Sequence, residues 1–257
     1  MTRALSLALL AAIAVPASAQ TPAADAWEDV LEARLSAPNA ATGLTRFDYG
    51  GFVADPEDRA ALDSYIAELS AMPEPEDDAD AAAYWANLYN AVTIDVVADN
   101  FPVDSIRDIK PNLFSIGPWK MKTVTVRGKA LSLDNIEHDI LRVRYSSPLV
   151  HYMVNCASVG CPNLLPALWD GATLDADRER AARAFVNSPR GVRLDGGKVE
   201  VSSIYKWFDE DFGGTRASVM DHIRAYADDT LAARLQGVRT YDSHAYDWTL
   251  NGREDTP

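Results

Sequence analysis

The chain has 257 residues, 47% of them hydrophobic, and a formal net charge of −14. This charge repels nucleic-acid phosphates and anionic lipid surfaces, so the composition argues against both kinds of partner. The length fits one large domain or two small ones, and the hydrophobic fraction is sufficient for a sizeable core without disulfide staples.

The first 19 residues have the pattern of a secretory signal peptide. Arg3 supplies a positive start, an apolar run extends from Leu5 to Val15, and Ala17-Ser18-Ala19 forms a cleavage pattern before residue 20. The run is shorter than the about 20 apolar residues that a membrane-spanning helix needs, although an uncleaved N-terminal tether is the alternative. No later segment is apolar enough to span a membrane. We therefore predict an exported soluble protein, periplasmic or secreted, with a signal peptide over 1–19 and a single domain over 20–257.

Helices dominate the prediction for the N-terminal half. Residues 20–26 are expected to form a mobile tail, residues 27–35 a helix and residues 47–52 an extended segment. A second helix is predicted to begin with Asp55 as N-cap and Pro56 at the first helical position.

Residues 81–98 are apolar on nearly every side, which predicts a helix at the centre of the domain. This segment contains Asn87 and Asn90. A buried amide without a hydrogen-bond partner costs about 1–3 kcal/mol, so both side chains are expected to be satisfied by neighbouring segments.

The C-terminal half mixes short strands and helices. We expect strands over 123–126 and 149–155, helices over 135–144, 174–185 and 219–235, a hairpin joining 192–195 to 198–201, a short helix opened by Ser202 and an extended segment over 241–250. Helices and strands do not alternate regularly. The sequence therefore predicts an α+β fold: a single globular domain with a buried central helix, surrounding helices and a small, mostly antiparallel sheet.

Candidate catalytic side chains concentrate between residues 134 and 163. Cys161 precedes a proline, which suggests a helical turn with the thiol near its N-cap, where the helix dipole lowers the pKa of a thiol. His151 or His138 could act as base and Asn87 or Glu137 as orienting group. This combination would form a Cys/His-dependent hydrolase or acyl transferase acting on a peptide-like or amide substrate.

The same side chains have a structural interpretation. Cys156 and Cys161 are close in sequence, and in an oxidising compartment such a pair most simply forms a disulfide, which leaves no thiolate to attack. His151 lies between apolar residues and is then a hydrogen-bonded core residue. A polar network that holds the fold, or binds a ligand, is the alternative role for the other candidates: Asn87, Asn90, Glu137, His138, Arg142 and Asn155.

Metal and cofactor sites are not predicted. The His, Glu and Cys residues lack the paired spacings of zinc sites, and the sequence contains no phosphate-binding glycine loop or dinucleotide motif. The acidic runs 74–80 and 209–211 are expected to be solvated faces, with a calcium site as the alternative. Several tryptophans could line a groove for a sugar or a peptide, although scattered tryptophans are more often core residues: Trp85, Trp119, Trp169, Trp207 and Trp248.

Several motifs in combination resemble the family called domain of unknown function 547, in its bacterial, exported branch. The residues that carry this resemblance are 84–91 (YWANLYNA), 133–142 (LDNIEHDILR) and 151–162, with weaker matches at 201–208 and 246–251, so that a motif core extends over about 80–251. The resemblance implies a single domain and no activity. Because plant-type members of the family keep the Ile-Glu-His step but not both cysteines, the resemblance favours four residues for a shared role: Asn87, Asn90, Glu137 and His138.

Two functions stay open at this point. The first is a periplasmic binding module whose partner is an unknown small molecule, a peptide or an envelope protein. The alternative is the Cys/His enzyme described above.

Overall fold

The computed structural model describes residues 21–112 and 114–253, and the predicted signal peptide lies outside this part of the chain. Its central element is helix α4 (Asp78–Ala98), in which every residue from Ala81 to Ala98 except Asp95 is buried. Asp77 caps this helix, because its carboxylate accepts hydrogen bonds from the backbone N–H groups of the first turn. The predicted buried central helix is confirmed.

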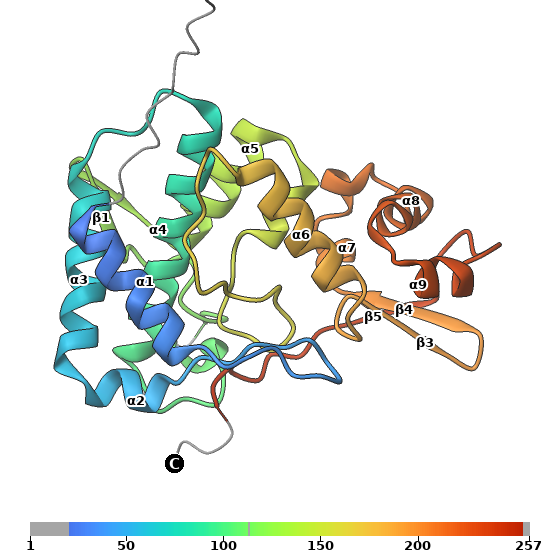
Figure 1. Cartoon of the computed structure of the whole chain (residues 1–257), viewed down its shortest axis with the longest axis horizontal. Helices are drawn as coiled ribbons and strands as arrows, with labels where there is room; N and C mark the ends of the chain where they lie inside the picture. The colour runs from blue at the N-terminus through green and yellow to red at the C-terminus, as the bar shows by residue number, and fades with distance from the viewer. Residues whose placement is uncertain (1–20, 113, 254–257) are drawn as a thin grey trace, which may run out of the picture.

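Three N-terminal helices pack around α4 on one side of the molecule: α1 (Pro22–Arg34), α2 (Tyr49–Ala54) and α3 (Pro56–Ala71) (Figure 1). The predicted cap of α3 at Asp55 is confirmed. Two expectations are wrong here. The supposed tail already belongs to α1, because Thr21 caps that helix and Pro22 begins it.

Residues 49–54 form helix α2 rather than an extended segment. The Asp48 side chain accepts a hydrogen bond from the backbone N–H of Gly51, and Tyr49 and Phe52 are buried in the core that α1, α3 and α4 share. The burial of these two rings overrides the low helix propensity of the two glycines between them.

The middle of the chain contains short elements: η1 (Ile106–Asp108), β1 (Val124–Val126), β2 (Lys129–Leu131), the π-helix η2 (Asn135–Leu141), α5 (Arg142–Tyr145) and the 3₁₀-helix η3 (Pro148–Tyr152). The predicted strand over 149–155 is wrong. Pro148 begins a helical turn there, and the Ser147 side chain accepts a hydrogen bond from the backbone N–H of Leu149.

The C-terminal part builds a second hydrophobic core. It contains α6 (Leu174–Val186), β3 (Val192–Asp195), β4 (Lys198–Ser202), α7 (Ile204–Trp207), η4 (Asp209–Phe212), α8 (Arg216–Tyr226), α9 (Asp229–Arg234) and β5 (Ser243–Ala245). The predicted hairpin is confirmed, with Val192 opposite Val201. The predicted last helix is divided in two, because Asp228 caps α9.

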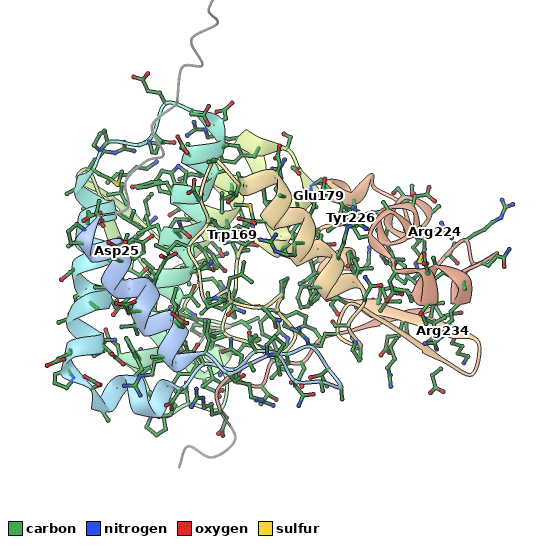
Figure 2. The ribbon with its side chains drawn as sticks, viewed as in Figure 1. Asp25, Trp169, Glu179, Arg224, Tyr226 and Arg234 are labelled. Atoms are coloured by element: carbon green, nitrogen blue, oxygen red, sulfur yellow. A yellow bond between two sulfur atoms is a disulfide. The ribbon has the colours of Figure 1, made fainter. Side chains whose placement is uncertain are left out.

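Helices α6 and α8 pack against each other in this second core. Tyr226 lies where the two helices meet (Figure 2), and the guanidinium of Arg183 lies 5.4 Å from the centre of its ring.

The predicted α+β class is confirmed, with one difference in the sheets. The described strands form two small sheets instead of one: antiparallel β1-β2, and β3-β4-β5, in which β5 runs parallel to β4. In the described part of the chain, no helix has the length and apolar character needed to cross a bilayer.

Candidate functional site

A cavity of about 530 Å³ lies where the two hydrophobic cores meet. Five segments that are distant in sequence contribute to its lining, together with Tyr89 of α4: residues 114–120, 134–138, 151–162, 204–208 and 246–248. The volume is in the range of sites for small organic molecules.

Three aromatic side chains pack together to form one wall of this pocket. The ring centres of Trp207 and Trp248 are 5.5 Å apart, those of Trp207 and Tyr246 4.8 Å, and those of Tyr246 and Trp248 4.5 Å. Trp119 contacts Trp248 edge to face, with 5.6 Å between ring centres. Trp207 is 46% exposed, which is unusual for so large an apolar side chain. We call Trp207, Tyr246 and Trp248 the aromatic wall.

The tryptophans of the sequence therefore divide into two groups. Trp119, Trp207 and Trp248 line the pocket. Trp85 and Trp169 are buried core residues, and their ring N–H groups donate hydrogen bonds to the Glu74 carboxylate and the Met153 carbonyl.

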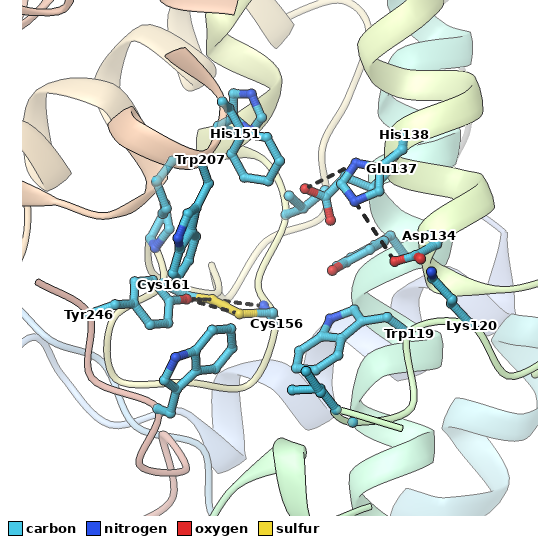
Figure 3. A pocket seen from close by; sticks show the side chains of 18 of the residues that line it. Trp119, Lys120, Asp134, Glu137, His138, His151, Cys156, Cys161, Trp207 and Tyr246 are labelled. Carbon is cyan, nitrogen blue, oxygen red and sulfur yellow. Dashed lines mark hydrogen bonds and ion pairs between the residues drawn. A yellow bond between two sulfur atoms is a disulfide. The ribbon is translucent and has the colours of Figure 1, made fainter. Parts of the chain in front are cut away.

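The opposite wall is acidic and belongs to the segment that forms the π-helix η2. Figure 3 shows Asp134, Glu137 and His138 across the pocket from Trp207 and Tyr246. His138 lies between the two carboxylates, with its Nε2 atom 3.8 Å from Asp134 Oδ1 and its Nδ1 atom 4.0 Å from Glu137 Oε1. A π-helical segment is rare and is frequent at functional sites. We call Asp134 and Glu137 the acidic wall.

Glu137 is buried and is the hydrogen-bond acceptor of the Tyr89 hydroxyl. Burial, and then the neighbouring Glu137 carboxylate, raise the pKa of Tyr89 well above its usual value. Tyr89 is therefore a neutral donor that holds the Glu137 carboxylate in place at the pocket surface.

His151 lies at another part of the pocket surface and is bound to a residue that sequence reasoning missed. Its Nε2 atom is 2.7 Å from the Asp211 carboxylate, and its ring stacks on Phe208 with 4.4 Å between ring centres. Arg142 donates two hydrogen bonds to the same carboxylate, at 2.6 and 3.1 Å. Burial alone would raise the pKa of Asp211, but the hydrogen bonds from His151 and Arg142 hold it well below its usual range.

The expectation that 209–211 is only a solvated face is therefore wrong for Asp211. The acidic run itself carried no local signal that could single out this residue, since its partners are 60 and 69 positions away in the chain.

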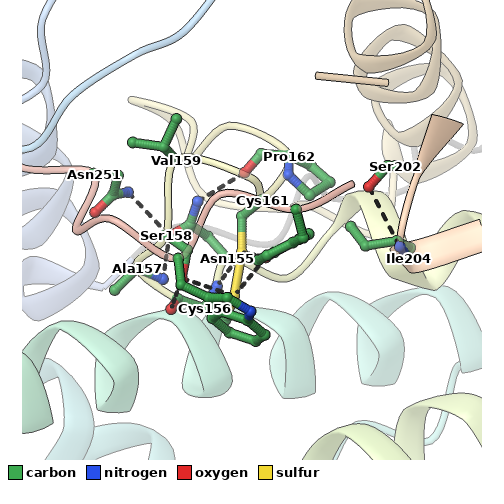
Figure 4. The surroundings of a disulfide bond; sticks show 12 residues. Asn155, Cys156, Ala157, Ser158, Val159, Cys161, Pro162, Ser202, Ile204 and Asn251 are labelled. Carbon is green, nitrogen blue, oxygen red and sulfur yellow. Dashed lines mark hydrogen bonds between the residues drawn. A yellow bond between two sulfur atoms is a disulfide. The ribbon is translucent and has the colours of Figure 1, made fainter. Parts of the chain in front are cut away.

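Cys156 and Cys161 are paired in the structure, with their sulfur atoms at disulfide distance, and both line the pocket (Figure 4). The residues after Pro162 are irregular, so the predicted helical turn with Cys161 at its N-cap is wrong. The loop is instead held by the Asn155 side chain, which donates to the Pro162 carbonyl at 2.7 Å and accepts from the Ala157 N–H at 2.9 Å.

Tyr246 joins the aromatic wall to the cysteine loop. Its hydroxyl lies 3.0 Å from each of the two sulfur atoms. Gly160 permits this approach, because a Cβ atom at that position would lie 2.9 Å from the Tyr246 ring. Burial raises the pKa of Tyr246, so its hydroxyl stays a neutral donor.

The predicted candidates thus fall into separate places. Glu137, His138, His151, Cys156 and Cys161 share the pocket. Arg142 does not line it, but its guanidinium contacts three neighbours of the pocket: the Asp211 carboxylate, the Phe208 ring at 4.7 Å from its centre, and His138 Nδ1 at 3.4 Å.

Asn87, Asn90 and Asn155 do not line the pocket, and their side chains bind backbone groups. Asn87 donates to the Trp169 carbonyl at 2.9 Å and accepts from the Trp169 N–H at 3.0 Å. Asn90 donates to the Met153 carbonyl and accepts from the Asn155 N–H, at 2.9 and 2.8 Å. These contacts hold the segments 153–155 and 169 on the central helix, as a structural polar network does.

Fold and site define an α+β protein of one domain with an aromatic and acidic pocket that has a cysteine pair at its surface. Residues 74–186 match the model of the family described as "Protein of unknown function, DUF547", and over this segment the chain resembles that family. The match includes α4, the π-helix and the cysteine loop, whereas the aromatic wall lies C-terminal to it. Comparison with curated proteins and with solved structures finds no match.

Proposed function

We propose that this protein is an exported binding protein whose pocket takes a small ring-shaped ligand with one apolar face and hydroxyl groups on its edge, the chemistry of a saccharide. The observation that carries the proposal is that the aromatic wall and the acidic wall face each other across one cavity of about 530 Å³ (Figure 3). Flat aromatic surface binds the apolar face of a ring, and carboxylates accept hydrogen bonds from its edge.

The charge of the pocket supports a neutral ligand over an ionic one. Lys120 and His138 line it together with Asp134 and Glu137, so the pocket offers both hydrogen-bond donors and hydrogen-bond acceptors. A ligand rich in hydroxyl groups can use both, since a hydroxyl donates and accepts.

The proposed catalytic groups, the two cysteines and His151, are engaged in other contacts. This favours binding over Cys/His catalysis. The two sulfur atoms are bonded to each other, and a disulfide contains no thiolate nucleophile. The Nε2 atom of His151 is engaged by Asp211. Two free thiols in the unreduced, denatured protein would count for the enzyme.

Replacement of Trp207 by alanine tests the aromatic wall. Neutral mono- and disaccharides are titrated into the protein while its tryptophan fluorescence is followed. We expect Trp207→Ala to weaken binding at least about tenfold, which corresponds to about 1.4 kcal/mol, because the exposed face on which the ring stacks is lost.

Lys206→Ala is the matched control, because this exposed neighbour pairs with Asp209 at 2.8 Å and does not line the pocket. Its affinity should equal that of the parent protein. If no saccharide binds, or if Trp207→Ala binds as tightly as the parent, the proposed ligand class is wrong.

Export is tested on the N-terminus of the protein recovered from an expressing bacterium. The pattern Ala17-Ser18-Ala19 predicts that the mature chain begins at Gln20 and is found in the periplasmic or secreted fraction. Recovery in the cytoplasm with Met1 or Thr2 at its N-terminus would contradict export. Replacing Ala19 by a bulky residue should block the cleavage and leave the precursor.

A further inference from the structure

The two cysteines of the pocket differ in their access to solvent. Cys156 is partly exposed at the pocket surface, whereas Cys161 is 3% exposed. A thiolate that enters the pocket therefore reaches the sulfur of Cys156 first. In thiol–disulfide exchange this geometry makes Cys161 the leaving group, and a leaving group departs faster when its thiolate is stabilised.

Cys161 has the donors that such a thiolate needs. The backbone N–H of Cys156 donates to Cys161 Sγ at 3.0 Å, and the Tyr246 hydroxyl lies 3.0 Å from the same sulfur (Figure 4 shows the loop). Sulfur in a disulfide is a weak acceptor. Both hydrogen bonds become charge-assisted, and so stronger, once the sulfur carries a negative charge.

A partly buried cation lies against the same loop. Arg190 donates hydrogen bonds to the carbonyl oxygens of Val159 and Cys161 and to the Asn163 side chain. Among the residues that the structure describes, Arg190 forms no ion pair with a carboxylate, and its Nε atom is buried without a hydrogen-bond partner. Burial lowers the pKa of Arg190 to about 10, which reflects the cost of a desolvated charge without a counter-charge.

We propose that Cys156 and Cys161 form a thiol–disulfide exchange centre that oxidises a dithiol entering the pocket, with Cys156 as the attacked sulfur and Cys161 as the stabilised leaving thiolate. This activity goes beyond ligand binding and does not require the ring-shaped ligand proposed above. In the oxidised loop the Cys156 N–H and the Tyr246 hydroxyl contact Cys161 Sγ, and Arg190 places a positive charge at the Cys161 carbonyl.

The exchange takes two steps. One thiolate of the substrate attacks Cys156 Sγ and forms a mixed disulfide, while the bond between Cys156 and Cys161 breaks and its electron pair leaves on Cys161. The second thiolate of the substrate then attacks the substrate sulfur of the mixed disulfide, and Cys156 departs as a thiolate. The substrate dithiol loses two electrons and two protons and becomes a disulfide, and the protein gains the two electrons as a dithiol.

Other charged groups near the loop either favour or oppose a negative charge on the sulfur. Glu137 and Asp247 are the acidic groups that influence the Tyr246 hydroxyl, and they oppose a further negative charge, whereas Arg190 favours one. His151 lines the same pocket but is engaged by Asp211. The direct contacts of Cys161 are with donors only, so we expect the favourable contribution to dominate at short range.

The test uses the oxidised full-length mature protein with dithiothreitol as the dithiol probe. We expect the folded protein to be reduced at least about tenfold faster at neutral pH than the same chain unfolded in urea, because only the folded loop stabilises the leaving thiolate. With glutathione as a monothiol probe, peptide mapping should find the mixed disulfide on Cys156. Reduction that is no faster than in the unfolded chain, or attachment to Cys161, would overturn the proposal.

The variant Tyr246→Phe tests whether the Tyr246 hydroxyl stabilises the Cys161 thiolate or only the fold. The absorbance of the thiolate, followed against pH in the reduced parent protein, should show one cysteine that ionises below the ordinary pKa of about 8.5. The variant should raise that pKa by about one unit and slow reduction severalfold, because a charge-assisted hydrogen bond is lost.

Tyr84→Phe, which removes a hydroxyl bonded to the Leu69 carbonyl, is the matched control and should change neither quantity. An ordinary thiol pKa in the parent protein would overturn the proposal without any variant. Saccharide binding is measured separately, so either proposal can fail alone.

Discussion

Replacing Asn87 by alanine is expected to lower the free energy of unfolding by about 3 kcal/mol. The Asn87 side chain satisfies both the N–H and the carbonyl of Trp169, and its removal leaves two buried backbone groups unpaired at about 1–3 kcal/mol each. Chemical denaturation monitored by circular dichroism measures this change. Because Asn87 does not line the pocket, we expect ligand binding by the variant to be unchanged at temperatures where it stays folded.

Gln236→Ala, which removes an exposed amide, is the control and should change the stability by less than about 0.5 kcal/mol. A variant Asn87→Ala that unfolds like the parent protein but loses ligand binding would show that Asn87 serves the pocket instead of the fold. The same comparison can be made for Asn90, which holds the segment 153–155 on the central helix.

Acidification is expected to destabilise the protein by about 2 kcal/mol between about pH 7 and about pH 5 through His222 alone. Burial, and then the neighbouring His151, lower the pKa of His222 to about 4. In the unfolded chain the pKa returns to its ordinary value of about 6.5, so the unfolded state binds more protons between these two values. Stability therefore falls as the pH falls through this window.

The variant His222→Gln tests whether His222 is the origin of this pH dependence of stability. Glutamine keeps a polar group near the Tyr152 hydroxyl, which lies 2.7 Å from His222 Nε2, but does not titrate. The free energy of unfolding of the variant should depend less on pH by about 2 kcal/mol over the window. His244→Gln, at an exposed histidine, is the control and should keep the full dependence of the parent protein. Equal pH dependence in all three proteins would contradict the assignment.

Asp211 contributes to the pH dependence of stability at a lower pH than His222. Its pKa is held below the ordinary carboxyl value, so the stability that it supplies is present above about pH 4 and is lost only on further acidification. The two contributions are therefore separable along the pH axis.

Short-range patterns were sufficient for the parts of the fold that are governed by short-range physics. The apolar residues of 81–98 had no polar face to present to water, so the sequence determined that this helix is central. Asp55 followed by Pro56 marked the start of α3, and the paired glycines 196 and 197 marked the turn of the β3-β4 hairpin. The same patterns failed where tertiary burial overrode local preference, as for the helix α2 and for η3, which carries His151.

Which residues line the pocket together was decided by the tertiary structure. The sequence itself pointed to Glu137, His138, His151 and the cysteine pair, because reactive side chains concentrate between residues 134 and 163. It did not show that Trp207, Tyr246 and Trp248 face them, or that Asp211 binds His151. The contact of His151 with Asp211 joins positions 60 residues apart, and that of Cys156 with Tyr246 joins positions 90 residues apart. Only the packing of two hydrophobic cores against each other brings these side chains within hydrogen-bond distance.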